Sequence, residues 1–311
     1  MVPTHNHALY IAKCLRSIIG QTLQPKKLLV IDDGSSDGSP AVIASVLENC
    51  PFESELIVRA NRGLCATLNE GLSISSGKYF AYIGSDDFWL PTFLEERSRL
   101  MENRENAVLG YGHAFLIDES DNIIDRTEDY REDWANYPDG NPREMLLKGV
   151  SPVSSTVFYR LSALENVSWN ETSRLEDYEM YLTLMNLGDF AFDPRTLSVW
   201  RQHGTNTSKD LSMMHYEVMD AQRRHVDGFG ITEDELLKVQ KRIKFRYARE
   251  LLQSGEKDAA IRLLRESWTA ARSPVAVAKS IAQLLMPKPT LVKYQEKKRA
   301  MRVNKNRDQK I

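Results

Sequence analysis

Residues 28–38 read Leu28-Leu29-Val30-Ile31-Asp32-Asp33-Gly34-Ser35-Ser36-Asp37-Gly38. A short apolar run that ends in acidic and glycine turn residues is typical of a buried strand. The pattern returns further along the chain, where the apolar run Tyr79–Ile83 is followed by Gly84-Ser85-Asp86-Asp87. We expect both acidic turns at the carboxyl ends of parallel strands, the edge at which open α/β sheets bind ligands.

Acidic turns that meet at one edge of a sheet repel each other. Two unit charges about 4 Å apart cost roughly 4 kcal/mol at an effective dielectric constant near 20. A divalent cation removes this repulsion and can then hold a diphosphate group. The two turns therefore predict a crevice that binds a cation together with a phosphorylated ligand.

The N-terminal part, residues 1 to about 118, alternates between strand-like and helix-like segments, which favours a doubly wound α/β fold with a mostly parallel sheet. Helical spacing is found around Ile11 and Leu15, after Ser39-Pro40, along Leu64–Leu72, and after Pro91. The predicted strands are Lys27–Ile31, Glu55–Val58 and Tyr79–Ile83.

The remainder is less regular and then becomes helical. We predict a hairpin of Ala114–Ile117 with Asn122–Asp125, a helix over Arg174–Leu187, and short strands at Phe190–Phe192 and Leu197–Trp200. A helical hairpin should turn at Ser254-Gly255. The predicted organisation is a main domain over residues 1–209, a helical appendage over 210–287, and a basic tail over 288–311.

Composition excludes several classes of protein. The net charge of −2 over 311 residues gives no overall positive electrostatic field, which argues against a nucleic-acid-binding protein. No apolar run reaches the length of about eighteen residues that a membrane span needs. An odd count of cysteines (Cys14, Cys50 and Cys65) without a signal peptide predicts buried thiols in a reducing compartment. The tail carries nine basic residues between Lys288 and Lys310, so we expect a flexible end or a contact with anionic lipid headgroups.

Taken together, the motifs of this chain resemble those of family 2 glycosyltransferases of the GT-A fold over roughly residues 1–209. The resemblance implies an inverting transfer of a sugar from a nucleoside-diphosphate sugar, expected to be a UDP-sugar, to a hydroxyl of a glycan or lipid-linked saccharide. It places the protein in polysaccharide biosynthesis, in the cytoplasm or at the inner face of its membrane. The motifs are Pro3-Thr4-His5-Asn6, Asp32-Asp33, Asn61-Arg62-Gly63, Ser85-Asp86-Asp87, Glu176-Asp177, and Trp200-Arg201-Gln202-His203.

On the donor side, the resemblance implies that Asp33 accepts hydrogen bonds from the base or ribose of the nucleotide. Arg62 is expected to pair with phosphate or sugar, with a plain surface arginine as the alternative. His5 and His7 are interpreted as surface histidines. Further nucleotide contacts are expected from Pro3, Thr4, Asn6 and Asp86.

The predicted metal site departs from the family pattern at one position. Typical members read Asp-x-Asp-Asp, and here Gly84 stands in place of the first aspartate, so a ribose contact from that position is lost or moved. Asp86 and Asp87 are expected to hold Mg²⁺ or Mn²⁺, without the sequence saying which of them ligates, and His203 is expected to complete the shell. The alternatives are an acidic turn before a helix and a structural histidine.

On the acceptor side, the resemblance makes Asp177 the general base that takes the proton of the attacking hydroxyl. Glu176 is expected to orient the acceptor or Asp177. The alternative is that both acids only favour the start of a helix through its dipole.

The start of the chain and the glycine keep other functions open. Family members usually place several apolar residues before Pro3, whereas this chain begins Met1-Val2, so we expect the first strand to be nearly absent, from a misplaced start or a truncation. That absence and Gly84 slightly favour an inactive nucleotide-sugar-binding scaffold whose helices serve for docking, whereas the motif residues Asp86, Asp87, Asp177 and His203 oppose it. A sugar nucleotidyltransferase is a third reading, but it requires a glycine-rich phosphate loop that the sequence lacks.

Overall fold

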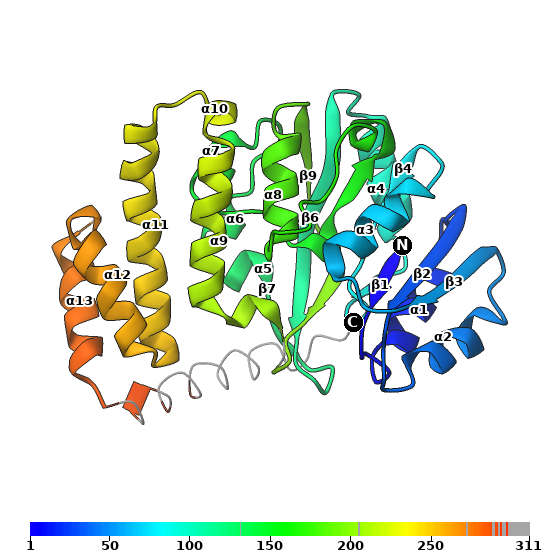
Figure 1. Cartoon of the computed structure of the whole chain (residues 1–311), viewed down its shortest axis with the longest axis horizontal. Coiled ribbons are helices and arrows are strands. Elements are labelled where there is room, and N and C mark those ends of the chain that lie inside the picture. The colour runs from blue at the N-terminus through cyan, green and yellow to red at the C-terminus, as the bar shows by residue number, and fades with distance from the viewer. Residues whose placement is uncertain are drawn as a thin grey trace.

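The computed structural model describes residues 1–130, 132–204, 206–271 and 273–287, together with Thr290, Leu291, Lys293 and Lys297. In Figure 1 the N-terminal strands and helices lie at one end of the molecule and the C-terminal helices lie at the other, with the long strands β6 and β9 between them. Most of the basic tail predicted over 288–311 lies outside the described residues.

The first sheet has the strand order β1-β2-β3 and is parallel throughout. Its middle strand contains the apolar run Leu28–Ile31 that precedes Asp32-Asp33, and Val30 and Ile31 are fully buried there. The intervening helices follow the predicted alternation of strand and helix. The elements are β1 (Val2–Thr4), α1 (Ile11–Ile19), β2 (Lys27–Asp33), α2 (Ser39–Leu47), β3 (Glu53–Arg59) and α3 (Leu64–Ser73).

The first strand is present, although the sequence predicted it to be nearly absent. Val2 pairs with Val30, and β1 therefore occupies its place beside β2. The carbonyl oxygen of Met1 accepts a hydrogen bond from the Ile83 amide at 3.2 Å, and the Met1 amino group donates to the Ala81 carbonyl at 2.8 Å. Three residues are enough to link the first sheet to the segment that follows β4, and so to align the two acidic turns.

The second sheet is mixed. Its order is β4-β8-β6-β9-β5, and β7 pairs with β6. Among the described strands of this sheet, β6 and β9 pair in parallel and the other pairs are antiparallel. The predicted hairpin joins β6 to β7 through a short turn, which permits antiparallel pairing alone. The two short strands predicted within 190–200 form one long strand. The elements are β4 (Tyr79–Phe80), β5 (Phe88–Trp89), β6 (Ala107–Ile117), β7 (Ile123–Arg126), β8 (Phe158–Arg160) and β9 (Asp189–Arg201).

The remaining helices surround this sheet and then extend beyond it. Gly255 adopts a left-handed φ of 83° and ends α11, as the predicted helical hairpin requires. No helix in the described ranges is both long enough and apolar enough to cross a bilayer. The helices are α4 (Phe93–Glu102), α5 (Thr127–Tyr130), α6 (Glu132–Ala135), α7 (Arg143–Leu147), α8 (Glu176–Leu184), α9 (Leu211–Arg224), α10 (Val226–Phe229), α11 (Glu233–Ser254), α12 (Lys257–Ser267) and α13 (Pro274–Leu285).

The first C-terminal helices share the core of the preceding domain. Val218 of α9 and Tyr247 of α11 belong to the same buried apolar cluster as Leu146 and Tyr178. The Gln222 side chain of α9 donates a hydrogen bond to the Tyr178 hydroxyl at 3.0 Å. Helices α9 and α11 are therefore built into the main body.

Candidate active site

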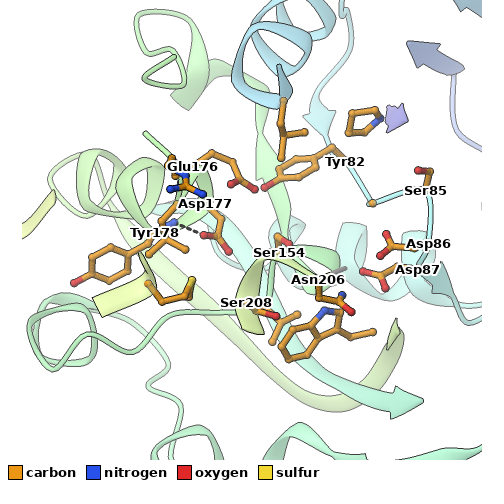
Figure 2. Close-up of a pocket in the computed structure, with 18 of the residues that line it drawn as sticks. Tyr82, Ser85, Asp86, Asp87, Ser154, Glu176, Asp177, Tyr178, Asn206 and Ser208 are labelled. Carbon is orange, nitrogen blue, oxygen red and sulfur yellow. Dashed lines mark hydrogen bonds between the residues drawn. The ribbon is translucent and has the colours of Figure 1, made fainter. Parts of the chain in front are cut away.

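One cavity of about 990 Å³ collects the acidic residues that the sequence singled out. Asp33, Asp86, Asp87 and Asp177 all line it, although they come from three separate segments of the chain. Figure 2 shows Asp86 and Asp87 on one side of this cavity and Asp177 on the other. The expected crevice at the carboxyl ends of the strands is therefore a single shared space.

The end of β1 and the loop after it line the cavity beside the first sheet, through Pro3 and Thr4 of the strand and Asn6 of the loop. Asn6 has a positive φ of 56°, a conformation that asparagine tolerates better than most residues. Its side-chain carbonyl accepts a hydrogen bond from the Ser36 amide at 2.8 Å. The turns that follow β1 and β2 are thus held together as one surface.

Asp33 is held by protein groups while it faces the cavity. Its carboxylate accepts hydrogen bonds from the main-chain amides of Arg62 and Gly63, both at 2.8 Å, and pairs with the Arg59 guanidinium. Only 5% of the residue is exposed. The carboxylate therefore fixes the turn before α3, and its orientation is set before any ligand binds.

Arg62 contributes its main chain to this turn, but its side chain points elsewhere. The guanidinium donates to Glu70 at 3.3 Å, and 58% of the side chain is exposed. Arg62 is not among the residues that line the cavity. The Arg62 side chain therefore lies on the surface, as in the alternative of a plain surface arginine.

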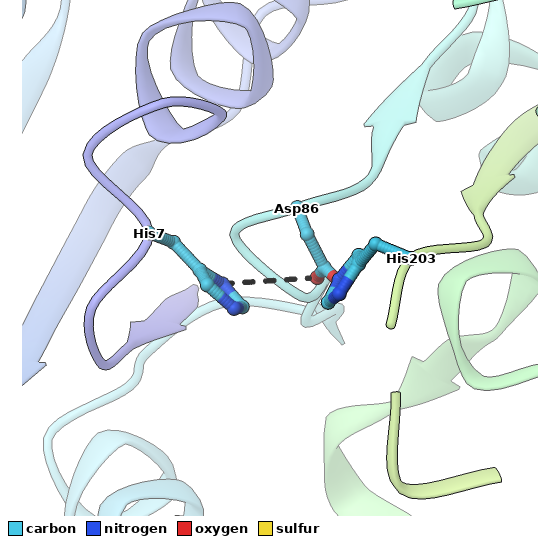
Figure 3. Close-up of side chains that lie close together, drawn as sticks. All are labelled: His7, Asp86 and His203. Carbon is cyan, nitrogen blue, oxygen red and sulfur yellow. Dashed lines mark hydrogen bonds and ion pairs between the residues drawn. The ribbon is translucent and has the colours of Figure 1, made fainter. Parts of the chain in front are cut away.

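Three side chains converge in a cluster that could hold a metal ion (Figure 3). They are His7, Asp86 and His203, and one ligand atom from each lies within 4.8 Å of the other two. Nε2 of His203 lies 2.8 Å from one Asp86 carboxylate oxygen, and Nδ1 of His7 lies 4.0 Å from the other. The cluster contains two of the predicted ligands and also His7, which the sequence analysis interpreted as a surface residue.

The protonation of the cluster suits a cation. Burial alone would raise the pKa of Asp86, but the hydrogen bond from His203 and the charge of His7 bring it below its ordinary value. Burial lowers the pKa of His7 against the attraction of Asp86. An ionised carboxylate beside the neutral imidazole of His7 offers lone pairs to a cation, which would replace the hydrogen bond between His203 and Asp86.

Asp87 has a different position. One of its carboxylate oxygens accepts a hydrogen bond from the Arg201 amide at 2.8 Å, and the residue is 7% exposed. Burial and the charge of Asp86 raise the pKa of Asp87 well above its ordinary value. The Arg201 side chain donates to the Asp86 carbonyl at 2.9 Å and to Asp121 at 2.6 Å. Asp87 and Arg201 therefore brace the loop that presents Asp86, and Asp87 lies outside the three-residue cluster.

The glycine that replaces the first aspartate of the family motif leaves room for Asp86. A Cβ atom at Gly84 would lie 2.8 Å from an Asp86 carboxylate oxygen. We expect Gly84→Ala to displace that carboxylate and to weaken Mn²⁺ binding about 10- to 100-fold, as changes beside a metal ligand commonly do. Gly204→Ala is the matched control, because a Cβ at that cavity residue meets nothing within 4 Å. Calorimetric titration with Mn²⁺ measures both variants, and equal affinities would refute this role of Gly84.

Glu176 and Asp177 begin α8 on the other side of the cavity, where both are half-buried. Burial raises the pKa of Asp177 to about 6. Burial and the neighbouring charge of Asp177 raise the pKa of Glu176 to about 8. One Asp177 oxygen accepts a hydrogen bond from the Tyr178 amide at 2.6 Å. Asp177 is therefore the member of the pair that ionises first as the pH rises, and so the better placed to accept a proton.

Sequence reasoning did not identify three aromatic residues of the site. Tyr82, Trp134 and Trp200 also line the cavity. Trp200 entered the sequence analysis only as a member of the motif that contains His203, and Tyr82 only as part of an apolar strand. Their shared location depends on the pairing of distant strands, which no local spacing reveals.

Comparison with known proteins identifies the family. Residues 1–167 match the profile of glycosyl transferase family 2. An uncharacterized glycosyltransferase of Nostoc sp. is 29% identical over 218 residues, which cover 66% of this chain and 65% of that protein. Chondroitin synthase of Escherichia coli is 28% identical over 232 residues, covering 70% of this chain and 31% of the enzyme.

Solved structures share the fold. The Pyrobaculum calidifontis mannosyltransferase PcManGT, solved with GDP-Man and Mn²⁺, superposes with a TM-score of 0.62 at 15% identity, covering 98% of this chain and 85% of that one. S. aureus TarS 1-349 with UDP-GlcNAc gives a TM-score of 0.61 at 15% identity and covers 95% and 90% of the two chains. The α/β architecture with its C-terminal helices is thus that of GT-A glycosyltransferases. Since the matched profile covers more than half of the sequence, the chain belongs to glycosyl transferase family 2.

Proposed function

We propose that this protein is an inverting, metal-dependent glycosyltransferase that moves a sugar from a nucleoside-diphosphate sugar to a hydroxyl of a saccharide. The observation that carries the proposal is the single cavity with the His7, Asp86 and His203 cluster on one side and Asp177 on the other. In an inverting displacement the nucleophile attacks opposite the leaving group. A base and a diphosphate site that face each other across one space suit that geometry.

The proposed donor site is the side of the cavity next to the first sheet. Pro3, Thr4, Asn6 and the fixed carboxylate of Asp33 would border the base and ribose. A UDP-sugar remains our expectation, since a carboxylate can accept from the N–H of uracil. The solved neighbours were crystallised with UDP-GlcNAc and with GDP-Man, so the fold accommodates more than one base. The outward position of the Arg62 side chain makes it the weakest of the proposed nucleotide contacts.

The donor set of the metal cluster favours Mn²⁺ over Mg²⁺. Two imidazole nitrogens beside one carboxylate suit a transition-metal ion better than Mg²⁺, which prefers a shell of oxygen ligands. His7, Asp86 and His203 would hold the ion. When bound, it would neutralise charge that grows on the leaving diphosphate. Asp87 would act through the loop it braces.

Aromatic side chains support a saccharide acceptor. Trp134 and Trp200 both line the cavity, with ring centroids 6.1 Å apart, and Tyr130 stacks on Trp134 at 6.0 Å. The apolar face of a sugar ring packs well on such surfaces through burial and dispersion. Asp177 would take the proton of the acceptor hydroxyl, and Glu176 would orient the acceptor or Asp177.

The proposal also includes the cellular location. We infer that the basic tail contacts a membrane and that the protein works at the inner membrane face.

Two sequence features had favoured an inactive scaffold, and the structure gives each of them another explanation. β1 is in place beside β2, and Gly84 leaves room for the carboxylate of Asp86. The C-terminal helices proposed as a docking module contribute Met214, Val218 and Tyr247 to the wall of the cavity. These helices therefore help to build the site.

Release of nucleoside diphosphate tests the proposal. The protein is incubated with UDP- and GDP-sugars, with Mn²⁺, with Mg²⁺ or with EDTA, and with or without methyl glycosides as acceptors. We expect Mn²⁺-dependent release from one donor, faster when a glycoside is present. Binding of a donor without release under any of these conditions would favour the scaffold.

A further inference from the structure

A buried hydroxyl without a hydrogen-bond partner faces the acceptor side of the cavity. Tyr82 lies in the segment after β4 and is 3% exposed, yet its hydroxyl oxygen makes no hydrogen bond to any described residue. Leaving a buried hydroxyl unsatisfied typically costs about 1–3 kcal/mol, so such a group calls for an explanation. Tyr82 also lines the cavity, which gives its hydroxyl a route to a partner.

Figure 2 shows the partner that the geometry offers, because the Tyr82 hydroxyl and the Glu176 side chain point toward each other across a corner of the cavity. The tyrosine ring is locked in place by its neighbours. It stacks on Tyr159 with the planes 11° apart, and it meets Trp169 edge-on at 5.8 Å. These contacts restrict the ring, so its hydroxyl stays on the side of the carboxyl, and the bond requires a movement of the Glu176 side chain alone.

We propose that the Tyr82 hydroxyl binds the Glu176 carboxyl and makes Tyr82 a positioning residue for the acceptor side of the site. This inference rests on the proposed function for its catalytic meaning, but not for its physical content. A carboxyl held by Tyr82 presents its second oxygen in a fixed direction, toward the acceptor or toward Asp177. The tyrosine acts through Glu176 and does not itself touch the reacting atoms.

The groups that surround Glu176 determine the sign of the expected effect. Asp177 faces Glu176 from the same helix, and Tyr82 faces it from the segment after β4. Tyr159 of β8 and Cys65 of α3 also lie near Glu176. Arg174 lines the same cavity. A phenol donates more strongly to an ionised carboxylate than to a neutral one. Tyr82 thus favours the ionised form of Glu176, while burial and Asp177 oppose ionisation. Its removal should make Glu176 hold its proton to a higher pH.

The test follows the Glu176 carboxyl carbon by NMR in the full-length protein with ¹³C-labelled glutamate side chains. The resonance is assigned by its loss in Glu176→Gln. In Tyr82→Phe we expect the titration midpoint to rise by about one pH unit, a tenfold change in the dissociation constant. Tyr181→Phe is the matched control, because this hydroxyl is also buried and unpartnered among the described residues but does not line the cavity. An unchanged midpoint in Tyr82→Phe, or an equal rise in Tyr181→Phe, overturns the proposal.

A kinetic measurement adds the catalytic part. With the donor identified by diphosphate release, Tyr82→Phe should lower kcat about tenfold while KM for the donor stays unchanged, and Tyr181→Phe should leave both unchanged. A rise in donor KM without a change in kcat would refute the positioning role. The NMR titration needs no donor, so a wild-type protein that releases no diphosphate refutes the proposed function without deciding the contact between Tyr82 and Glu176.

Discussion

Replacing Asp177 by Asn is expected to lower the rate of sugar transfer by about 10²- to 10⁴-fold, the usual contribution of a general base. The amide keeps the size and position of the side chain but cannot accept the proton of the acceptor hydroxyl. Affinity for the donor nucleotide should stay unchanged, because Asp177 lies on the opposite side of the cavity from Asp86. Single-turnover transfer and calorimetric titration with the nucleoside diphosphate measure the two quantities separately.

Glu176→Gln is the matched control for that variant. It makes the same change at the adjacent residue, and because the raised pKa of about 8 keeps Glu176 protonated at pH 7, the neutral amide resembles the native state. We expect less than a roughly tenfold loss of rate at pH 7. If Asp177→Asn lost transfer and nucleotide affinity to the same extent, the base would have to be sought elsewhere.

The pH dependence of the transfer rate follows from the carboxyl group of Asp177. Burial raises the pKa of Asp177 to about 6, and the base acts only when it has lost its proton. The transfer rate should therefore fall as the pH drops through about 6 and should level off above it. In Asp177→Asn this acidic limb should disappear from whatever activity remains.

Replacing Asp86 by Ala is expected to abolish specific Mn²⁺ binding and to lower donor turnover by at least about 100-fold. The variant removes the only carboxylate of the three-residue cluster and leaves two imidazoles. Mn²⁺ affinity is measured by electron paramagnetic resonance, and turnover by release of nucleoside diphosphate.

His7→Ala and Asp87→Asn, measured in the same way, distinguish the two possible ligand sets. We expect His7→Ala to weaken Mn²⁺ binding directly. Asp87→Asn keeps a side chain that can still accept the hydrogen bond of the Arg201 amide, so it should affect Mn²⁺ less. The reverse order of effects would restore Asp87 as the ligand, and wild-type Mn²⁺ affinity in Asp86→Ala would place the ion elsewhere.

Local sequence predicted the parts of the fold that local interactions determine. The apolar run through Val30 and the turn at Asp33 identify a buried strand and its functional end, because burial and turn chemistry act within a few residues. The helical hairpin at Gly255 was predictable for the same reason, since only glycine adopts its left-handed φ without strain. Family resemblance supplied what these patterns could not, namely that Asp86 and Asp177 face the same cavity.

What could not be predicted depends on contacts between distant segments. His7 joins Asp86 and His203 only because β1 pairs with β2 and β9 brings its end to the same place. The mixed pairing of the second sheet is likewise set by how long segments pack. The position of Tyr82 was hidden by its place within an apolar run, where a buried aromatic side chain is the ordinary reading.

The location of a bound Mn²⁺ ion is the decisive measurement for the proposed glycosyltransferase site. Crystals grown with Mn²⁺ and UDP, measured near the manganese absorption edge, give an anomalous peak that marks the ion independently of the fitted protein atoms. We expect one peak within about 2.3 Å of ligand atoms of Asp86 and His203, with His7 beside it and the diphosphate facing Asp177 across the cavity. A peak away from these residues, or a nucleotide bound in its place without any ion, would contradict it.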